Sequence, residues 1–237
     1  MKKIFLLALL AMGTAEVRAQ SIAAGTISLG GSIGYSRYTQ KNSFTGGNGT
    51  AYSSERVGSQ FSLSPSVGYF VADNLAVGLN LYYSSQQDGQ TTYSPSSSFA
   101  LKELDPRTQL RVGPYVQYYK MLTGQFGITG TLSAGYQNTR YQNYNNNGSS
   151  NPIIYDYKGS GYYASLAPGL VFFPIPKLGL NASFGSLGYS RLSYDYPTTT
   201  SGNNPAPKDY ESTTSDFGAN FGLNQLVFGG TYYFGRN

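Results

Sequence analysis

The closely spaced acidic residues of this chain are its first candidates for chemistry. Two carboxylate pairs, Glu103/Asp105 and Asp209/Glu211, lie in polar segments. Two carboxylates can act as the acid and the nucleophile of a glycosidase, so residue type alone leaves that activity open. Loop carboxylates are normally solvated charges, however, and we favour that interpretation. The chain has no His and no Cys, which removes a His general base, a Ser–His nucleophile, His or thiolate metal sites and disulfides. We therefore expect no catalytic residue, metal or cofactor, and no enzyme.

Arg111 is the one charge that sequence alternation places deep on a polar face. In a barrel it can form a weakly anion-selective constriction, or it can fill the interior as a hydrogen-bonded plug. The interior of an eight-stranded barrel is just wide enough for side chains to fill, so we favour the plug. The predicted lumen network consists of Arg111, Tyr115, Gln109, Gln117, Asn80 and Asn181.

The elements that must position these residues are alternating strands. Apolar and small polar residues alternate with period two, as expected for strands with apolar surroundings on one side and polar surroundings on the other. In the last segment the alternation slips near Asn224-Gln225, which indicates a β-bulge or a strand end. The predicted strands are Gly25 to Tyr38, Val57 to Val71, Leu75 to Ser84, Arg107 to Lys120, Gln125 to Gln137, Gly161 to Phe173, Leu178 to Tyr189 and about Asp216 to Phe234.

Short and long links alternate strictly between these strands. The short links cover 72–74, 121–124 and 174–177, and the long polar links cover 39–56, 85–106, 138–160 and 190–215. This alternation is typical of up-and-down barrels. We predict an all-β fold: a closed, up-and-down, antiparallel transmembrane β-barrel of eight strands.

A repeated motif marks each hairpin of the predicted barrel. It consists of Pro, any residue, an aliphatic residue, any residue and two aromatic residues, and it begins at Pro65, Pro114 and Pro168. Each proline removes a ladder donor inside a strand, so we expect these prolines at bulges. The aromatic pairs, together with Tyr232-Tyr233-Phe234, are predicted to form a periplasmic girdle. The predicted outer girdle consists of Tyr35, Tyr83, Tyr136 and Tyr162, whereas Tyr189 is out of phase and stays unassigned.

The N-terminus predicts export. Lys2 and Lys3 precede an apolar stretch from Ile4 to Met12 that is too short to span a bilayer, and 17–19 form a small-residue cleavage site. We expect a signal peptide at 1–19 and a barrel domain at 20–237. Cleavage lowers the net charge from +5 to +3, because it removes Lys2, Lys3, Arg18 and Glu16. This charge is too weak and scattered to suggest nucleic-acid binding.

Composition supports a barrel with a lipid-facing wall. Charged residues make up 11% of the chain, against about 25% in soluble domains, and yet the mean hydropathy is −0.30. An apolar outer face averaged with a neutral polar lumen accounts for both values.

The outer ends of the strands carry two further features. Arg37, Arg56, Arg140, Lys158 and Arg191 can pair with lipopolysaccharide phosphates, or they can be ordinary solvated charges, and the sequence favours neither. Tyr141, Tyr144, Tyr155 and Tyr157 crowd into one polar link. This composition is typical of adaptable binding surfaces, but solvated tips without a partner explain it as well, and we favour the latter.

Three features together resemble the outer-membrane β-barrel domain family, which includes the small OmpX- and OmpA-type eight-stranded barrels. They are the repeated hairpins, the turn from Val71 to Gly78 and the terminal Gly229-x-x-Tyr232-x-Phe234. The resemblance covers nearly all of the chain after the signal peptide. Gly229, Tyr232 and Phe234 match the family's assembly signal for the barrel-insertion machinery. Val227 stands where a polar residue is usual, and 235–237 extend past the usual terminal aromatic residue.

The resemblance implies a barrel-only outer-membrane protein with both termini in the periplasm. The outer-membrane barrel enzymes of the phospholipase, lipid-A acyl-modifying and omptin-protease families use a His, which this chain lacks, so the chain does not resemble them. We expect a monomer with a structural, surface-presenting role, surrounded by outer-membrane lipid and lipopolysaccharide. The alternatives are a narrow channel for small solutes and an adhesin or ligand-binding barrel that acts through its loops.

Overall fold

The computed structural model describes residues 21–47, 49–87, 91–94, 104–145, 153–199 and 207–236. The predicted signal peptide at 1–19 and Glu103 lie outside these residues. Strands are the regular elements of the described chain, as predicted: β1 (Ile27–Thr45), β2 (Ala51–Ala72), β3 (Leu75–Gln87), β4 (Thr91–Ser94), β5 (Arg107–Met121), β6 (Phe126–Asn145), β7 (Ile153–Ile175), β8 (Leu178–Tyr194), β9 (Thr198–Thr199) and β10 (Thr213–Phe234).

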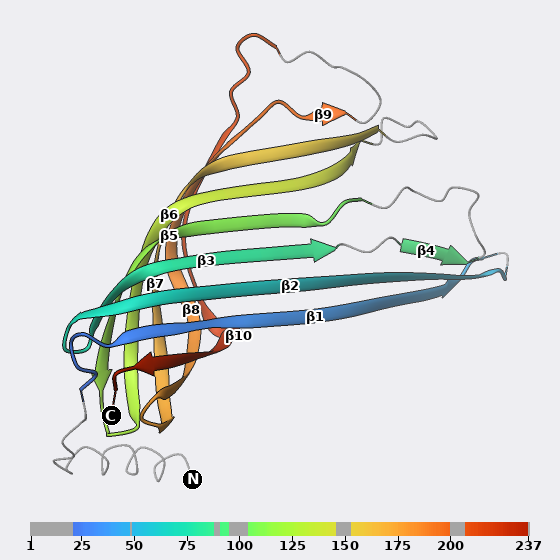
Figure 1. Cartoon of the computed structure of the whole chain (residues 1–237). Coiled ribbons are helices and arrows are strands. Elements are labelled where there is room, and N and C mark those ends of the chain that lie inside the picture. The colour runs from blue at the N-terminus through green and yellow to red at the C-terminus, as the bar shows by residue number, and fades with distance from the viewer. Residues whose placement is uncertain are drawn as a thin grey trace.

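The eight long strands form a closed antiparallel up-and-down barrel, which confirms the predicted fold class (Figure 1). Each long strand pairs with its neighbours in the chain, and β1 pairs with both β2 and β10. The two short strands lie outside the ring, where β4 pairs with β2 and β9 pairs with β7. The short turns, the start of β1 and the end of β10 share one end of the barrel, which we call the short-turn end. The opposite end is the hairpin end.

At the hairpin end the strands are longer than the sequence predicted. Residues 39–56 and 138–160 were expected to be loops, but β1 and β2 pair as far as Thr45↔Ala51, and β6 and β7 pair as far as Asn145↔Ile153. Figure 1 shows these strands extending well past the ring. The prediction detected strands by the alternation of apolar and polar residues. At the hairpin end neither face of the strands is apolar, so the alternation stops although backbone pairing continues.

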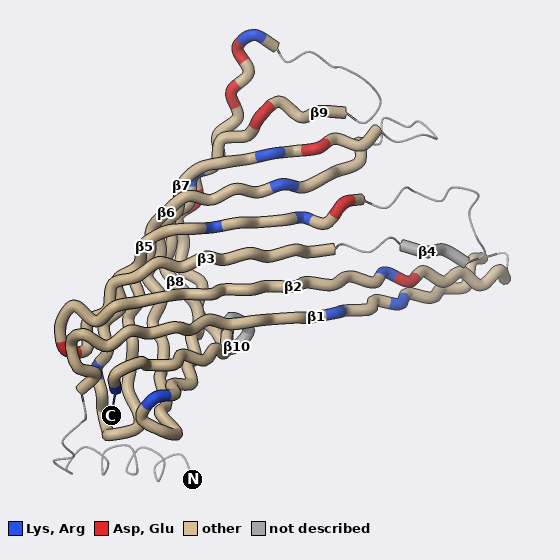
Figure 2. Tube along the Cα trace, in the orientation of Figure 1, with Lys and Arg blue, Asp and Glu red and all other residues tan. Residues whose placement is uncertain are grey.

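Side chains alternate between an outer wall and a lumen. On β5 every residue from Leu110 to Lys120 with an even number is exposed, and every residue with an odd number is buried or half-buried. Leu79, Val112 and Leu132 represent the apolar outward residues on three adjacent strands. Charged residues gather on the long hairpins and near the short-turn end (Figure 2). A belt of apolar side chains therefore surrounds the middle of the wall.

The phase slip predicted near Asn224-Gln225 is confirmed. The β8–β10 register passes from Phe221↔Gly185 directly to Leu226↔Phe184, so that 222–225 are extra residues on β10. The β7–β8 register shifts at the same place, between Leu166 and Gly169. Gly185 takes a φ of 121° there, a conformation that L side chains rarely adopt.

This bulge also explains the outward orientation of Tyr189 and the position of Pro168. Between Leu166↔Leu187 and Gly169↔Ser183, β8 has three residues opposite two of β7. This one extra residue on β8 reverses which face its side chains take, so Tyr189 pairs with Ala164 and faces outward beside the predicted outer girdle. Pro168 lies at the bulge, as predicted. Pro65 and Pro114 do not: the ladder on one side is interrupted beside each of them, but its register continues unchanged.

Candidate functional site

Arg111 lies in the lumen between two tyrosine rings. Its guanidinium carbon lies 5.3 Å from the centre of the Tyr163 ring and 6.0 Å from that of the Tyr82 ring. These distances are within the range of cation–π attraction. The Nε atom of Arg111 is buried and has no hydrogen-bond partner. Aromatic faces therefore hold this cation, and Tyr163 is a member of the lumen site that the sequence reasoning missed. The alternation of β7 could have found it, since Tyr162 was assigned to the outer wall.

The other predicted lumen residues form separate groups around Arg111. The Tyr163 hydroxyl donates to Asn80 Oδ1 at 3.3 Å, which links Asn80 to Arg111 through the ring. Gln117 Oε1 accepts from Tyr119 at 2.8 Å, and Asn181 Nδ2 donates to Thr231 Oγ1 at 2.8 Å. Gln109 is half-buried on the inward face of β5.

Tyr115 lies across the lumen wall from β5 towards β1. Its hydroxyl is hydrogen-bonded to Ser28 and Ser66. The ring passes over Gly78, where an added Cβ would lie 2.7 Å from Tyr115 Cε1. The side chain therefore joins three strands on the lumen side, and glycine on the intervening strand provides the space for it.

Aromatic side chains close the short-turn end from within. Tyr233 is fully buried, with its ring centre 5.2 Å from that of Phe173 and 6.1 Å from that of Phe70. Its hydroxyl lies 3.1 Å from the hydroxyl of Tyr119. We call this buried cluster the aromatic floor; it consists of Ile22, Phe70, Ala76, Tyr119, Met121, Val171, Phe173 and Tyr233.

The aromatic floor corrects the predicted periplasmic girdle. The sequence analysis placed both members of each aromatic pair on the outer wall. In the structure the first member faces outward and the second faces inward: Tyr69 is 51% exposed, whereas Phe70 is fully buried. The reason is the period of a strand, because successive side chains point to opposite faces.

Arg236 is a second residue that the sequence reasoning missed. It follows the end of β10 and turns back under the barrel, where its guanidinium carbon lies 3.7 Å from the centre of the Phe173 ring. It is 4% exposed, and none of its side-chain nitrogens has a hydrogen-bond partner. Arg236, beyond the terminal aromatic residue, therefore helps to close the barrel.

The predicted assembly-signal residues lie together where β10 meets β1. Tyr232 and Phe234 face outward with their ring centres 4.8 Å apart. Gly229 packs against β1, since an added Cβ would lie 2.6 Å from Gly31 O. The two rings form an exposed aromatic edge at the last strand of the barrel.

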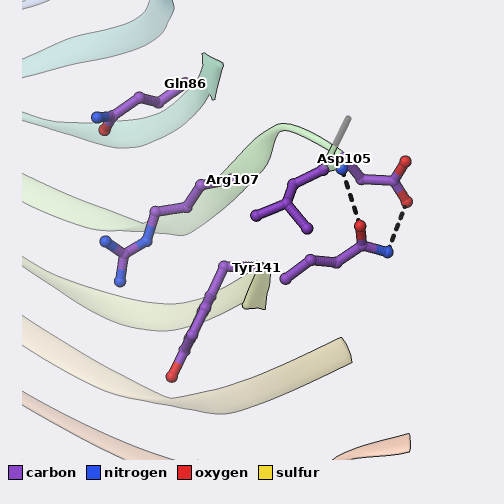
Figure 3. Close-up of a pocket in the computed structure, with 6 residues that line it drawn as sticks. Gln86, Asp105, Arg107 and Tyr141 are labelled. Atoms are coloured by element: carbon purple, nitrogen blue, oxygen red, sulfur yellow. Dashed lines mark hydrogen bonds between the residues drawn. The ribbon is translucent and has the colours of Figure 1, made fainter. Parts of the chain in front are cut away.

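A small hollow opens among the long hairpins. It has a volume of about 90 Å³ and is lined by Gln86, Leu104, Asp105, Arg107, Tyr141 and Gln142. Figure 3 shows Arg107 beside Tyr141 on the neighbouring strand, with its guanidinium carbon 4.9 Å from the ring centre. Gln142 holds Asp105 through two hydrogen bonds, of 2.8 and 2.9 Å. A cavity of this size has room for a few water molecules or one small polar group.

Tyrosine rings continue from this hollow along the inner face of the hairpins. The Tyr141 and Tyr157 rings stack with their centres 4.9 Å apart, and Tyr194 meets Tyr141 edge-on at 6.3 Å. Burial raises the pKa of the Tyr141 and Tyr157 hydroxyls above the usual value. The Tyr141 and Tyr157 rings therefore stabilise the hairpin by cross-strand stacking.

Basic side chains surround the hairpin end on the outward face. Arg37, Lys158 and Arg191 are exposed, and each shares the outward phase of an aromatic residue two or four positions away on its own strand. Arg140 has the same orientation but pairs with Asp156, to which its Nη2 and Nε donate at 2.9 and 3.0 Å. This hydrogen bonding and the charge of Asp156 raise the pKa of Arg140. Arg56, in contrast, falls on the inward face.

Neither a protein-family model nor a curated protein sequence matches the chain. Fold and site together define an eight-stranded β-barrel with an apolar outer belt, a polar lumen and an aromatic floor. Among the described residues, no helix is long and apolar enough to cross a membrane. The same residues contain no group of three His, Cys, Asp or Glu that could hold a metal ion.

Proposed function

We propose that this protein is an integral outer-membrane β-barrel that contributes to envelope structure and presents long hairpins to the outside. The observation that carries this proposal is the apolar belt on a closed barrel. A closed barrel satisfies its backbone polar groups internally, which is the condition for strands to span lipid. The predicted signal peptide is consistent with export, and a soluble barrel would gain nothing from an outward apolar belt.

The barrel has a defined orientation in this proposal. Short turns lie in the periplasm and long hairpins outside, as in outer-membrane barrels generally. Because β1 begins and β10 ends at the short-turn end (Figure 1), both termini are periplasmic. Outward Tyr69 and Tyr118 then lie at the periplasmic interface, and Tyr35 and Tyr189 lie at the outer one.

Heat modifiability tests this placement. Closed membrane barrels resist SDS until they are boiled, because every strand is held by its neighbours. We expect the protein in the outer-membrane fraction, with a gel mobility that changes on boiling. Recovery from the soluble periplasm, with the same mobility before and after boiling, would contradict the proposal.

Lipopolysaccharide is the proposed partner of the outward basic residues. Arg37, Lys158 and Arg191 lie just beyond the outer aromatic residues, at the level where phosphates of the outer leaflet are expected. A cation near a charged membrane surface contributes about 1 kcal/mol, so replacing all three with Gln is expected to weaken binding to lipopolysaccharide micelles about 100-fold.

The matched control for this measurement uses basic residues on the inward face. Arg56→Gln with Arg107→Gln also removes positive charge from the hairpin end, but from the side that faces the lumen. We expect titration of lipopolysaccharide against this variant to give nearly the original affinity. Equal losses of binding free energy per removed charge, three charges in the first variant and two in the control, would show that overall charge, rather than an outward ring, determines the affinity.

The aromatic floor favours a filled barrel over the narrow channel. Its eight buried residues close the short-turn end, and Arg111 lies above them against two tyrosine rings. An adhesin or ligand-binding role for the hairpins remains a prediction, and the hollow beside Arg107 and Tyr141 is where we would look for it first.

A further inference from the structure

The junction between β1 and β10 is much shorter than the other junctions of the ring. Only five residue pairs join the two strands, from Ile27↔Phe234 to Gly31↔Gly230. On its other side β1 pairs with β2 over nineteen residues, and β10 pairs with β8 from Tyr232 as far as Thr213. Among the described residues, β1 beyond Gly31 and β10 before Gly230 are therefore paired on one side only. We call this interval the seam.

The seam lies inside the apolar belt. Ile33 and Phe228 flank it on the outward face and are 72% and 67% exposed, against 58% for Leu79, which is paired on both sides in β3. Val227 has the inward phase of β10 and is nevertheless 50% exposed. The inward position of Val227 is thus accessible at the seam, which is bordered by the apolar side chains of Ile33 and Phe228.

A permanently open seam does not suit a bilayer. Unpaired backbone groups at membrane depth have no water to bind, and spanning structures avoid them. The two free edges are antiparallel and face each other, so they can satisfy one another. Closure also requires that the side chains on the two edges are compatible when the edges pair.

They match in register and in phase. Extending the observed β1–β10 register by four pairs joins Ser32 to Gly229, Ile33 to Phe228, Gly34 to Val227 and Tyr35 to Leu226. Outward apolar residues then meet outward apolar residues, and on the inward face Ser32 meets Gly229 and Gly34 leaves room for Val227. At the fork the strands are already close, since a Cβ on Gly229 would lie 3.5 Å from Ser32 Cβ. The extra residues 222–225 begin directly above the fourth pair and limit the extension.

We infer that the seam is a lateral gate between the lumen and the lipid, which closes by these four pairs. In the structure the ring is joined at the five observed pairs, and the four further pairs are not formed. This inference rests on the proposed membrane location. Ile33 and Phe228 border the seam on the lipid side, so a molecule that enters it while the four pairs are open must be apolar or amphipathic.

Disulfide trapping tests the gate, because the chain contains no Cys. Paired positions on antiparallel strands lie at distances that a disulfide can bridge. Ile33→Cys with Phe228→Cys forms a disulfide only when the gate closes. Ile33→Cys with Leu63→Cys is the matched control, since these residues are paired in the observed β1–β2 ladder. Each protein is inserted into lipid vesicles and oxidised for increasing times.

We expect the control pair to oxidise at a rate that rises with oxidant. The gate pair is expected to oxidise completely but more slowly, with a rate that becomes independent of oxidant because closing limits it. Oxidation as fast as the control at every oxidant concentration would show a seam that is always closed. No oxidation would show that the strands do not meet. Either result overturns the gate.

A second pair and the location of the protein complete the design. If Phe228→Cys prevents folding, Tyr35→Cys with Leu226→Cys reports the same register, with Tyr35→Cys and Phe61→Cys as its control. A protein that forms the control disulfide but stays out of the vesicles would contradict the membrane proposal. A protein that inserts and never traps the seam would contradict only the gate.

Discussion

Replacing Phe70 with Ala is expected to destabilise the barrel by about 3–5 kcal/mol, the usual cost of removing a buried Phe side chain. Phe70 is fully buried at the centre of the aromatic floor, with ring centres 5.5 Å from Tyr119 and 6.1 Å from Tyr233. Removing its ring leaves a cavity among residues on three different strands. Urea unfolding of the protein refolded into vesicles measures the change.

The neighbouring residue supplies the control. Tyr69 is also aromatic, but it faces outward, and its truncation leaves no internal cavity. We expect Tyr69→Ala to cost only about 1 kcal/mol. If the two variants lost equal stability, the assignment of the second aromatic residue to the interior would be wrong, and both residues would belong to the wall.

Replacing Gly78 with Ala is expected to cost at least about 3 kcal/mol, the upper part of the range for overpacking. An added Cβ would collide with the carbonyl oxygen of Val67 and would lie 2.7 Å from the Tyr115 ring. The first obstacle is backbone, which cannot rotate away as a side chain can. The strand or Tyr115 must move, and either movement disturbs the contact that joins β5 to β1.

Gly130 provides the comparison for this second variant. It lies on β6, and an added Cβ there would meet nothing within 4 Å. We expect Gly130→Ala to leave the unfolding free energy unchanged or to raise it by less than about 1 kcal/mol. Refolding yield and urea midpoint for the two variants measure the difference. A tolerated Gly78→Ala would mean that Tyr115 does not lie across β3.

The sequence predicted the strands because alternation is a local signal. Two residues on one strand are enough to show which positions share a face, so the eight segments, their short links and the slip near Asn224-Gln225 could all be found without a partner strand. The same signal could have found Phe70 and Tyr163, had each aromatic doublet been divided between the two faces.

Other features depend on what lies opposite each residue. The full lengths of β1 and β2 could not be found, because polar strands beyond the belt have no apolar phase. Tyr189 could not be placed until the bulge at Gly185 was seen, since one extra residue on β8 reverses its face. Pro65 and Pro114 were expected at bulges, but their strands keep their register.

By itself, the sequence determined the fold class, the number of strands and the separation of a polar lumen from an apolar wall. Only the tertiary structure decided how the barrel is filled and where it is weakly joined. Tyr119 and Tyr233 are 114 residues apart in the chain and meet in the floor, Arg111 meets rings from β3 and β7, and the seam lies between the first and last strands of the ring. The physical reason is that closing a barrel brings together residues whose proximity depends on register and bulges in every strand between them.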